Sequence, residues 1–552
     1  MCGIFSYVKN SENLSEKEIN FSRKKTNELK HRGPDHYGEW INKNIFLGIQ
    51  RLAINDLSVS GNQPFYFEDK VMVFNGEVYN YVEKRKILEE KGYKFKSNSD
   101  TEVFFYYIIE YGFKNLDKIN GMFSFIYFDG KKIHFGNDIF SEKTLFYYID
   151  KSKILISSEL SNLSDISEKS ENKELIYSYL SFGHLIGNKT FYKNIYKLTP
   201  GQILTVDQNF NIKFFKFFDP KKHYLNNNKS QEHPKLKTNV FFENIENSLK
   251  QKFFADREIG ILYSGGIDST IVADQFLNNK KNFTVATYAQ NKKKFIDENQ
   301  HTKGIDSIFI NDDNLKMDNK SVLRLFGQPM DSFTSLAIES LCCELSKKNI
   351  NCALSGMGGD ELFFGYNKFY DHMKIKFQIN KILKLGIKSF NPSLLSKSHL
   401  VFDFIKNKDY LEWINDIFVF NNNYSLIENI FFNDIEYFLP NSRCLTNDVA
   451  SMRQSVELRG VFLDIDLLKN ILNYNLDDLA SLGKKRILID FHNNKVKNFN
   501  NYFKHPFYIK SNLNDYDSNK KNQYIKSFLP GFKKKILDDA LNDRTDMLLS
   551  FF

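Results

Sequence analysis

Cysteine is scarce in this chain of 552 residues, which contains only five. A disulfide framework needs cysteines that are more numerous and more regularly spaced, so we expect none here. There is also no CxxC pair and no histidine–cysteine spacing that is typical of a metal site. The cysteines are Cys2, Cys342, Cys343, Cys352 and Cys444.

Long apolar runs and a strong excess of one charge are also missing. No run of about 18 apolar residues occurs and the N-terminus lacks an apolar signal region, so we expect neither membrane spanning nor secretion. The net charge of +9 is a small difference between 76 basic and 67 acidic residues. Without a clustered basic face, nucleic-acid binding is not expected. These absences favour a cytoplasmic protein, for which a homodimer is possible.

The length predicts more than one domain, because single cores stop growing beyond about 250–300 residues. Residues 2–218 contain short apolar runs between turn signals, which indicates β-structure. Residues 219–236 are polar and are interpreted as a linker. Across 237–552 strand-like and helix-like segments alternate, and beyond about residue 370 the amphipathic stretches look helical. We therefore predict an α/β multidomain protein.

Specific runs support this division. In the first part we predict strands at 71–74, 123–128 and 154–158, with turns at Asn75-Gly76 and Asp129-Gly130, and a helix at 99–112 that Asp100 and Thr101 cap. In the second part we predict strands at 259–263, 283–288 and 352–355. Their alternation with helices indicates a doubly wound parallel sheet, in which ligands bind at the carboxyl ends of the strands.

Cys2 is the most informative single residue. If Met1 is removed, Cys2 carries a thiol and a free α-amine, whose pKa of about 7.7–8.0 lets it accept the thiol proton near neutral pH. An N-terminal amine is an established base for a nucleophile. The plainer alternative is that Cys2 is only a small hydrophobic residue.

Four motifs follow Cys2 in order: His31–Asp35, Arg51–Ile54, Asn75–Asn80 and Ser99–Glu102. Together they resemble the class II glutamine amidotransferase domain over about residues 2–200. This resemblance implies an αββα Ntn-hydrolase sandwich that uses L-glutamine. It implies that Cys2 is the nucleophile, that Asn75 and the Gly76 amide form the oxyanion hole, and that Arg51, Leu52, Ile54, Asn75, Gly76, Glu77 and Asp100 bind glutamine.

The side chains suit these roles. A guanidinium such as Arg51 binds an α-carboxylate with two hydrogen bonds, and Glu77 with Asp100 would balance the ammonium group. Taken singly, each motif has a plainer interpretation. Asn75-Gly76 could be a hairpin turn, Asp100 a helix N-cap and Arg51 a surface residue.

The segment 137–145 departs from the family's usual RDxxGxKPL pattern. Asp138 and Lys143 are retained, whereas Asn137, Ser141 and Thr144 replace Arg, Gly and Pro. Because this segment lies towards the second domain in relatives, the changes put the coupling between domains in doubt.

Ser264–Ser269 follows a predicted strand and opens a predicted helix. Gly265 and Gly266 let backbone amides approach a phosphate, and the helix N-terminus favours negative charge. Asp268 fits such a loop only if a cation is present, and Mg²⁺ bridging carboxylate and pyrophosphate resolves the conflict. The string resembles the PP-loop of ATP pyrophosphatases, which cleave ATP to AMP and pyrophosphate.

Leu354–Tyr366 resembles the SGxGxDExFxGY motif of the asparagine synthetase family. This implies that Asp268 and Asp360 hold Mg²⁺. Asp297-Glu298 resembles a further acidic pair of relatives. The residues expected to bind ATP are Leu262, Ser264, Gly265, Gly266, Asp268, Ser269, Val285, Ser355 and Gly356.

Three later segments continue the resemblance. Asp448–Met452 and Glu457–Asp464 match the family's D-x-x-S-M and E-x-R-x-P-F-L-D patterns, with Val in place of Pro. Gly483–Leu488 resembles the segment whose lysine stabilises the adenylated intermediate. Lys485 matches that catalytic lysine, and Lys484 is the alternative.

Met357 is the most consequential departure. Asparagine synthetases usually carry Asp or Glu there, and a thioether cannot replace a carboxylate in charge or proton transfer. After Gln328-Pro329, Ser332 and Thr334 fall where relatives tend to have Asp and Ser. Only Lys504–Phe507 partly matches the family's R-x-K-x-G-F tail segment.

Over residues 2 to about 510 the chain resembles glutamine-hydrolysing asparagine synthetase. The resemblance implies that ammonia from glutamine passes through an internal tunnel to a carboxylate that ATP and Mg²⁺ have activated as an acyl-adenylate. Aspartate is the default acceptor, and a sugar acid or peptide carboxylate is the alternative. A third hypothesis, a regulatory protein with an inactive synthetase domain, predicts loss of Asp268 or Asp360, and both are present.

Overall fold

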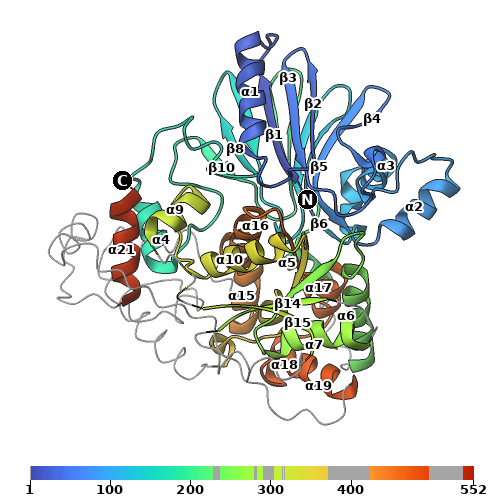
Figure 1. Cartoon of the computed structure of the whole chain (residues 1–552), viewed down its shortest axis with the longest axis vertical. Coiled ribbons are helices and arrows are strands. Elements are labelled where there is room, and N and C mark those ends of the chain that lie inside the picture. The colour runs from blue at the N-terminus through green and yellow to red at the C-terminus, as the bar shows by residue number, and fades with distance from the viewer. Residues whose placement is uncertain are drawn as a thin grey trace.

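A computed structural model describes residues 2–227, 237–278, 283–289, 304–311, 313, 315, 318–370, 423–495 and 539–551. Asp297-Glu298 and Lys504–Phe507 lie outside these residues. In Figure 1 a β-sandwich from the first part of the chain lies above an α/β part, and the start of the chain lies at their junction. The homodimer and the domain boundaries at 218 and 237 stay predictions.

The sandwich consists of two six-stranded sheets. In spatial order, the first contains β10 (Ile195–Lys197), β8 (Phe146–Ile149), β9 (Lys153–Ser157), β1 (Cys2–Lys9), β3 (Ile45–Arg51) and β2 (His36–Asn42). The second contains β12 (Ile212–Lys216), β11 (Gln202–Val206), β7 (Ile133–Asn137), β6 (Gly121–Phe128), β5 (Lys70–Val78) and β4 (Phe65–Phe67).

Helices cover both outer faces of the sandwich. α1 (Glu16–Glu28) packs on β1 and β3, whereas α3 (Asp100–Tyr111) packs on β5 with α2 (Tyr81–Glu90) beside it. The inner faces meet in an apolar layer that includes Ile4 and Val73, both 0% exposed. This arrangement confirms the predicted αββα fold.

The second part is built on a parallel sheet in the order β15-β14-β13-β16-β17. Its strands are β15 (Asp306–Ile310), β14 (Thr284–Tyr288), β13 (Ile259–Leu262), β16 (Cys352–Ser355) and β17 (Glu457–Gly460). The chain moves outward from β13 on one side and then on the other, which confirms the doubly wound sheet.

Helices pack on both faces of the parallel sheet. Val285 and Ala286, neighbours on β14, belong to two different apolar clusters, because successive strand residues point to opposite faces. α7 (Ile267–Asn278) shares the first cluster with α6 (Thr238–Lys252) and α19 (Arg486–Lys495). α10 (Thr334–Lys347) shares the second with α16 (Leu445–Met452).

The remaining helices surround these layers. They are α4 (Lys173–Phe182), α5 (Pro220–Asn227), α9 (Asn319–Phe326), α11 (Gly359–Leu362), α15 (Leu426–Asn433), the π-helix η7 (Asp434–Cys444), α17 (Ile465–Ile471), α18 (Leu476–Ser481) and α21 (Asp539–Phe551). Short 3-10 turns occur at 59–61, 113–118 and 367–369. Figure 1 shows α21 beside α4 and α9, so the last described residues pack against the middle of the chain.

Four local predictions differ from the structure. Asn75-Gly76 does not end a strand, because β5 continues through it to Val78. The N-cap of α3 is Ser99, whose Oγ accepts from Thr101 N–H, and Asp100 is the first helical residue. The polar segment 219–236 begins with α5, which buries Tyr224. Beyond residue 370 the structure adds a strand, β17, to the helices that were expected.

Candidate active sites

Cys2 lies at the start of β1, at the edge of the sandwich that faces the α/β part (Figure 1). It is 3% exposed and pairs in register with Arg51 on β3. Its backbone N–H donates to Asn75 Oδ1 across the sandwich at 2.9 Å. Burial raises the pKa of the Cys2 thiol, and the Arg51 guanidinium opposes this rise. A thiol in this environment needs a nearby base before it can act as a nucleophile.

Gly76 brings β5 close to its neighbour on the second sheet. Its φ is +149°, and a Cβ there would lie 2.0 Å from the carbonyl oxygen of Met122 on β6. Only glycine fits so close to a backbone carbonyl. Asn75 is 0% exposed, and its Nδ2 donates to Ser124 Oγ at 3.3 Å. The Asn-Gly pair is therefore built into a strand opposite Cys2.

If the Gly76 amide is the oxyanion donor that the resemblance implies, we expect Gly76→Ala to lower glutamine hydrolysis about 10²-fold or more, because the backbone would be displaced. The strain should also lower the free energy of unfolding by about 1–3 kcal/mol. Gly92→Ala is the matched control, since Gly92 also has a positive φ of 92° but nothing lies within 4 Å of its Cβ position. Glutamate release and urea unfolding measure both effects, and equal losses in the two variants would contradict the clash.

A loop after β3 holds Arg51. Its guanidinium donates to Asn62 Oδ1 at 2.9 Å and to the backbone oxygens of Asp56 and Asn55 at 2.6 and 3.3 Å. Arg51 is only 5% exposed, so it is not a surface strand residue. The side chains of Leu52 and Ile54, 2% and 1% exposed, belong to the core beside it.

Glu77 and Asp100 form a pair of buried carboxyl groups. Asn55 Nδ2 donates to Glu77 Oε2, and Val78 N–H donates to Asp100 Oδ2 at 2.7 Å. Burial raises the pKa of both, to about 6 for Asp100, and the negative charge of Glu457 adds to each rise. Two crowded carboxylates are well placed to receive a cationic group such as an ammonium.

Gln63 is a site residue that sequence reasoning missed. Its Nε2 lies 3.9 Å from Cys2 Sγ and donates to Phe74 O at 3.1 Å, while its Oε1 accepts from Phe74 N–H. Asn55, which holds Glu77, was also missed. Both residues lie in the loop between β3 and β4 and outside the recognised motifs, so no sequence signal marked them.

The predicted phosphate loop joins β13 to α7. Gly265 has a positive φ of 69°. Ser269 Oγ donates to Gly266 O at 3.0 Å and accepts from Ser264 N–H at 3.2 Å, which closes the loop. The structure therefore brings the predicted serines and glycines together at the carboxyl end of a parallel strand, where such sheets bind ligands.

Asp268 and Asp360 converge from two neighbouring strand ends. Lys485 Nζ lies 2.8 Å from Asp360 Oδ1 and also contacts Asp268 Oδ2. Burial disfavours the charge of Lys485, but the two carboxylates outweigh it and raise the pKa of its ammonium. Lys484 Nζ instead contacts Asn367 Oδ1. The structure thus brings Lys485, and not Lys484, to the two carboxylates.

Glycines of the 355–366 motif allow this convergence. A Cβ on Gly356 would lie 2.5 Å from Asp268 Cβ, and one on Gly365 would lie 2.0 Å from Asp360 Oδ1. Two carboxylates that share one cation in this way fit Mg²⁺, which typically binds one or two carboxylates together with substrate phosphates. Among the described residues no group of three or more metal-ligating side chains occurs.

The other predicted nucleotide contacts surround this point. Ser355 is 9% exposed and its Oγ donates to Arg459 O at 3.4 Å. Leu262 is partly buried beside the loop, whereas the side chain of Val285 is 0% exposed and belongs to the core. Val285 could therefore meet a nucleotide only through its backbone, and this contact stays a prediction.

Met357 packs against residues from two other elements. Asn447 Nδ2 lies 2.9 Å from its Sδ, and its Cε approaches Gly460 at the end of β17. Ser332 and Thr334 lie 3.4 Å apart through their hydroxyls, and Ser332 Oγ is 2.9 Å from Thr446 Oγ1. The altered positions thus border the same helix, α16.

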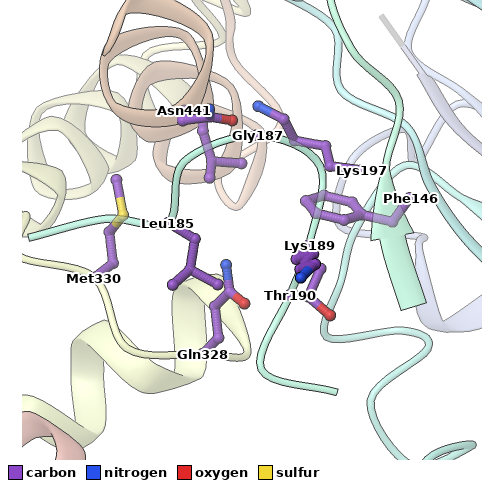
Figure 2. A pocket seen from close by; sticks show the side chains of 10 residues that line it. Phe146, Leu185, Gly187, Lys189, Thr190, Lys197, Gln328, Met330 and Asn441 are labelled. Carbon is purple, nitrogen blue, oxygen red and sulfur yellow. The ribbon is translucent and has the colours of Figure 1, made fainter. Parts of the chain in front are cut away.

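Gln328 lies at the junction of the two parts. Its Oε1 accepts from Phe191 N–H at 3.2 Å, and it lines a small cavity with Lys197 and Asn441 (Figure 2). Burial lowers the pKa of Lys197 to about 7, and its Nζ donates to Pro440 O at 2.8 Å. The complete lining is Phe146, Leu185, Gly187, Lys189, Thr190, Lys197, Gln328, Met330, Asn441 and Leu445.

Buried ion pairs connect the two parts. Arg32, 0% exposed, donates to the Cys2 carbonyl at 3.1 Å and to both Asp448 carboxylate oxygens at 3.0 Å. Lys143 Nζ donates to Asp448 Oδ1 at 3.1 Å. Asp448, the aspartate of the D-x-x-S-M pattern, therefore connects Arg32, which contacts the start of β1, with the 137–145 segment.

The substitutions in 137–145 fit together. Asn137 Nδ2 donates to Ser141 Oγ at 2.8 Å, and Ser141 has a φ of +55°, where glycine would be usual. Asp138 accepts from four backbone N–H groups, including those of Glu142 and Lys143. The segment keeps an ordered turn and its ion pair to Asp448 despite the departures.

No helix in the described part of the chain is long and apolar enough to cross a membrane. The cytoplasmic location stays a prediction.

Comparison with known proteins agrees with the two-part architecture. Residues 1–217 match the glutamine amidotransferase domain model, and residues 241–489 match the asparagine synthase model. The chain is 28% identical over 79% of its length to asparagine synthetase [glutamine-hydrolyzing] 1 of Bacillus subtilis, covering 74% of that protein. It is 29% identical over 70% of its length to a putative asparagine synthetase of Methanocaldococcus jannaschii, covering 79% of that protein.

A further relative carries a different name. An amidase of Gibberella zeae is 25% identical over 67% of this chain, which covers 60% of that protein. Both domain models nevertheless match this chain. The amidotransferase model covers the two sheets of the sandwich, and the synthase model covers the parallel sheet. The chain belongs to the glutamine-hydrolysing asparagine synthetase family of ATP-dependent amide ligases.

Proposed function

We propose that the protein hydrolyses glutamine at Cys2 and transfers the ammonia to a carboxylate activated by ATP, with L-aspartate as the first acceptor to test. The observation that carries this proposal is the convergence of Asp268, Asp360 and Lys485 at the strand ends. It supplies carboxylates for a metal and a cation for a nucleotide, and so argues against an inactive synthetase domain.

In the proposed first half-reaction, Cys2 Sγ attacks the glutamine carboxamide and the C–N bond breaks, so that ammonia leaves. Water then hydrolyses the thioester to glutamate. After Met1 removal, the Cys2 nitrogen that now donates to Asn75 Oδ1 becomes the α-amine, takes the thiol proton and passes it to the departing nitrogen, which leaves as ammonia. Arg51 would hold the substrate α-carboxylate, and Glu77 with Asp100 its ammonium.

In the proposed second half-reaction, the acceptor carboxylate attacks the α-phosphate of ATP and pyrophosphate leaves. The 264–269 loop would bind the phosphates through its backbone amides. Lys485 would stabilise the negative charge that builds up on the nucleotide. Asp268 and Asp360 would hold Mg²⁺, which neutralises phosphate charge when bound.

A different carboxylate remains the second candidate for the acceptor. Two points favour it: Met357 stands where the family resemblance leads us to expect an acid, and one relative is named an amidase. The adenylation residues are the same in both cases, so only the acceptor differs.

The test is to incubate the protein with amide-¹⁵N glutamine, ATP, Mg²⁺ and a panel of carboxylates, and to follow pyrophosphate and labelled amide. Labelled asparagine would support the first candidate. Labelled amide from a sugar acid or peptide, but not from aspartate, would support the second. Absence of pyrophosphate with every carboxylate would overturn the synthetase function.

Asp100 gives a pH prediction for the glutaminase site. Its carboxyl group, with a pKa of about 6, is ionised above this pH and protonated below it. In this proposal glutamine binding needs the carboxylate. We therefore expect kcat/KM for glutamine to decrease more steeply once the pH falls below about 6. Asp100→Asn should weaken glutamine use at all pH values and lose the steepening. A wild-type profile with no change of slope near pH 6 would contradict the role.

A further inference from the structure

Glu142 is a buried carboxyl group with few hydrogen-bond partners. It is 3% exposed, and its Oε1 has no hydrogen-bond partner in the described part of the chain. Its Oε2 accepts one long hydrogen bond, of 3.4 Å, from Gly460 N–H at the end of β17. A buried polar group without partners costs free energy. A purely structural role therefore explains Glu142 poorly.

Glu142 also lies beside Met357. Met357 Cε and Glu142 Oε2 lie 2.8 and 3.0 Å from the same point, the position that a Cβ on Gly460 would take. The family resemblance leads us to expect an acid at position 357. Glu142 therefore brings a carboxyl group next to a position that lacks the expected one. It reaches this place from the glutaminase half, across the junction.

The surroundings connect Glu142 to the glutaminase site. Its neighbour Lys143 is linked through Asp448 and Arg32 to the Cys2 carbonyl. The Tyr79 hydroxyl, one residue beyond β5, is likewise buried with no hydrogen-bond partner among the described residues. Unpartnered polar groups at a junction between two sites are suited to bind a small polar species that passes between them.

We propose that Glu142 accepts a proton from ammonium at the synthetase end of the transfer route, and so supplies the carboxylate that position 357 lacks. This inference rests on the proposed function. One N–H bond of ammonium breaks and the proton moves to the Glu142 carboxylate, which leaves neutral ammonia. The nitrogen lone pair then attacks the acyl-adenylate carbon, AMP leaves with the electron pair of the C–O bond, and the amide nitrogen loses its surplus proton to water. Glu142 later returns its own proton to bulk water.

The electrostatic environment of Glu142 agrees with this role. Burial raises the pKa of Glu142 to about 8, and the charge of Asp138 adds to the rise. Near neutral pH both forms are therefore populated, as an acid–base group requires. The ionisable groups that face it are Asp138 and Lys143 from its own segment, Lys252 from α6, Tyr79 from the end of β5 and Cys444 from the end of η7.

The test uses the full chain with ATP, Mg²⁺, ammonium chloride and L-aspartate, or the carboxylate that the wild type amidates. For E142Q we expect amide formation at pH 7 to fall about 10²-fold and to recover as pH rises, because free ammonia then replaces the missing base. Glutamate release from glutamine should be unchanged. The double variant E142Q/M357E should recover amide formation at pH 7, since it restores a carboxylate at the same place.

Other outcomes separate the two proposals. Amide formation by E142Q at the wild-type rate and with the wild-type pH profile would overturn this inference alone. A loss that neither higher pH nor M357E reverses would show a structural role and would also overturn it. If E142Q does not fold, E142D must keep the wild-type pH profile for the inference to stand. No amide from the wild type with any carboxylate would overturn the proposed function itself.

Discussion

Cys2→Ala is expected to lower glutamine-dependent amide formation about 10⁶-fold, the order of loss seen when a covalent nucleophile is removed. Ammonium-dependent amide formation should persist, because Cys2 lies in the sandwich and the proposed adenylation residues lie at the strand ends of the parallel sheet. Glutamate release, labelled amide and pyrophosphate measure the two half-reactions separately.

Cys343→Ala is the matched control for this prediction. Cys343 lies on α10 and is partly exposed, so its removal should leave both nitrogen sources in use. Loss of ammonium-dependent activity in Cys2→Ala, with the fold intact, would contradict two separate sites. Retained glutamine use would contradict the nucleophile assignment.

Asp448→Asn is expected to lower the free energy of unfolding by about 3–5 kcal/mol, because it removes the carboxylate that pairs with buried Lys143 and leaves buried Arg32 with Glu159 as its remaining anion. Arg32, Lys143 and Asp448 are each 0–1% exposed in their side chains, so water cannot replace the lost partner. The same change should uncouple glutamine hydrolysis from amide formation, so that more glutamate is released for each amide that forms. Urea unfolding measures the first effect, and the ratio of glutamate to amide the second.

An exposed aspartate provides the control. Asp490 pairs with Arg486 one turn away on α19, and exposed pairs of this kind contribute about 0.3–0.5 kcal/mol. Asp490→Asn should therefore change the free energy of unfolding little and leave the product ratio unchanged. Equal behaviour of the two variants would show that the buried pairs neither stabilise the junction nor couple the sites.

Much of the fold could be predicted from the sequence, because its signals are local. Alternating and continuous apolar runs predicted β5, β6, β13 and β16, since a half-buried or fully buried strand requires them. Strand β17 was missed because Glu457-Leu458-Arg459 lacks an apolar run. Its charged residues are stabilised by tertiary contacts, such as the Arg459 Nη1 bonds to Lys252 O and Phe254 O.

For the sites, chemistry-bearing motifs were more informative than local propensity. The glycine and aspartate positions of the phosphate loop converge as the motif predicted, and the structure favours Lys485 over Lys484. Asn75-Gly76 shows the limit of propensity: the pair that suits a turn instead passes through β5, because the close approach of Met122 O selects glycine. Gln63 could not be predicted, since its place beside Cys2 arises only when the loop folds over the strand.

Arg32 contacts both the backbone of Cys2 and the carboxylate of Asp448 on α16, so one side chain connects the start of β1 with a helix of the α/β part. A connection of this kind is a physical route by which ligand binding in one part could affect binding in the other. If a ligand on the synthetase side tightens the hold of Asp448 on Arg32 and thereby changes glutamine affinity, glutamine must change the affinity for that ligand by the same factor. A coupling of about 1–3 kcal/mol, the usual range, would appear as a 5- to 150-fold reciprocal shift in the two dissociation constants. Under the proposed function, such a linkage would match the release of ammonia in one part to the presence of the acceptor in the other.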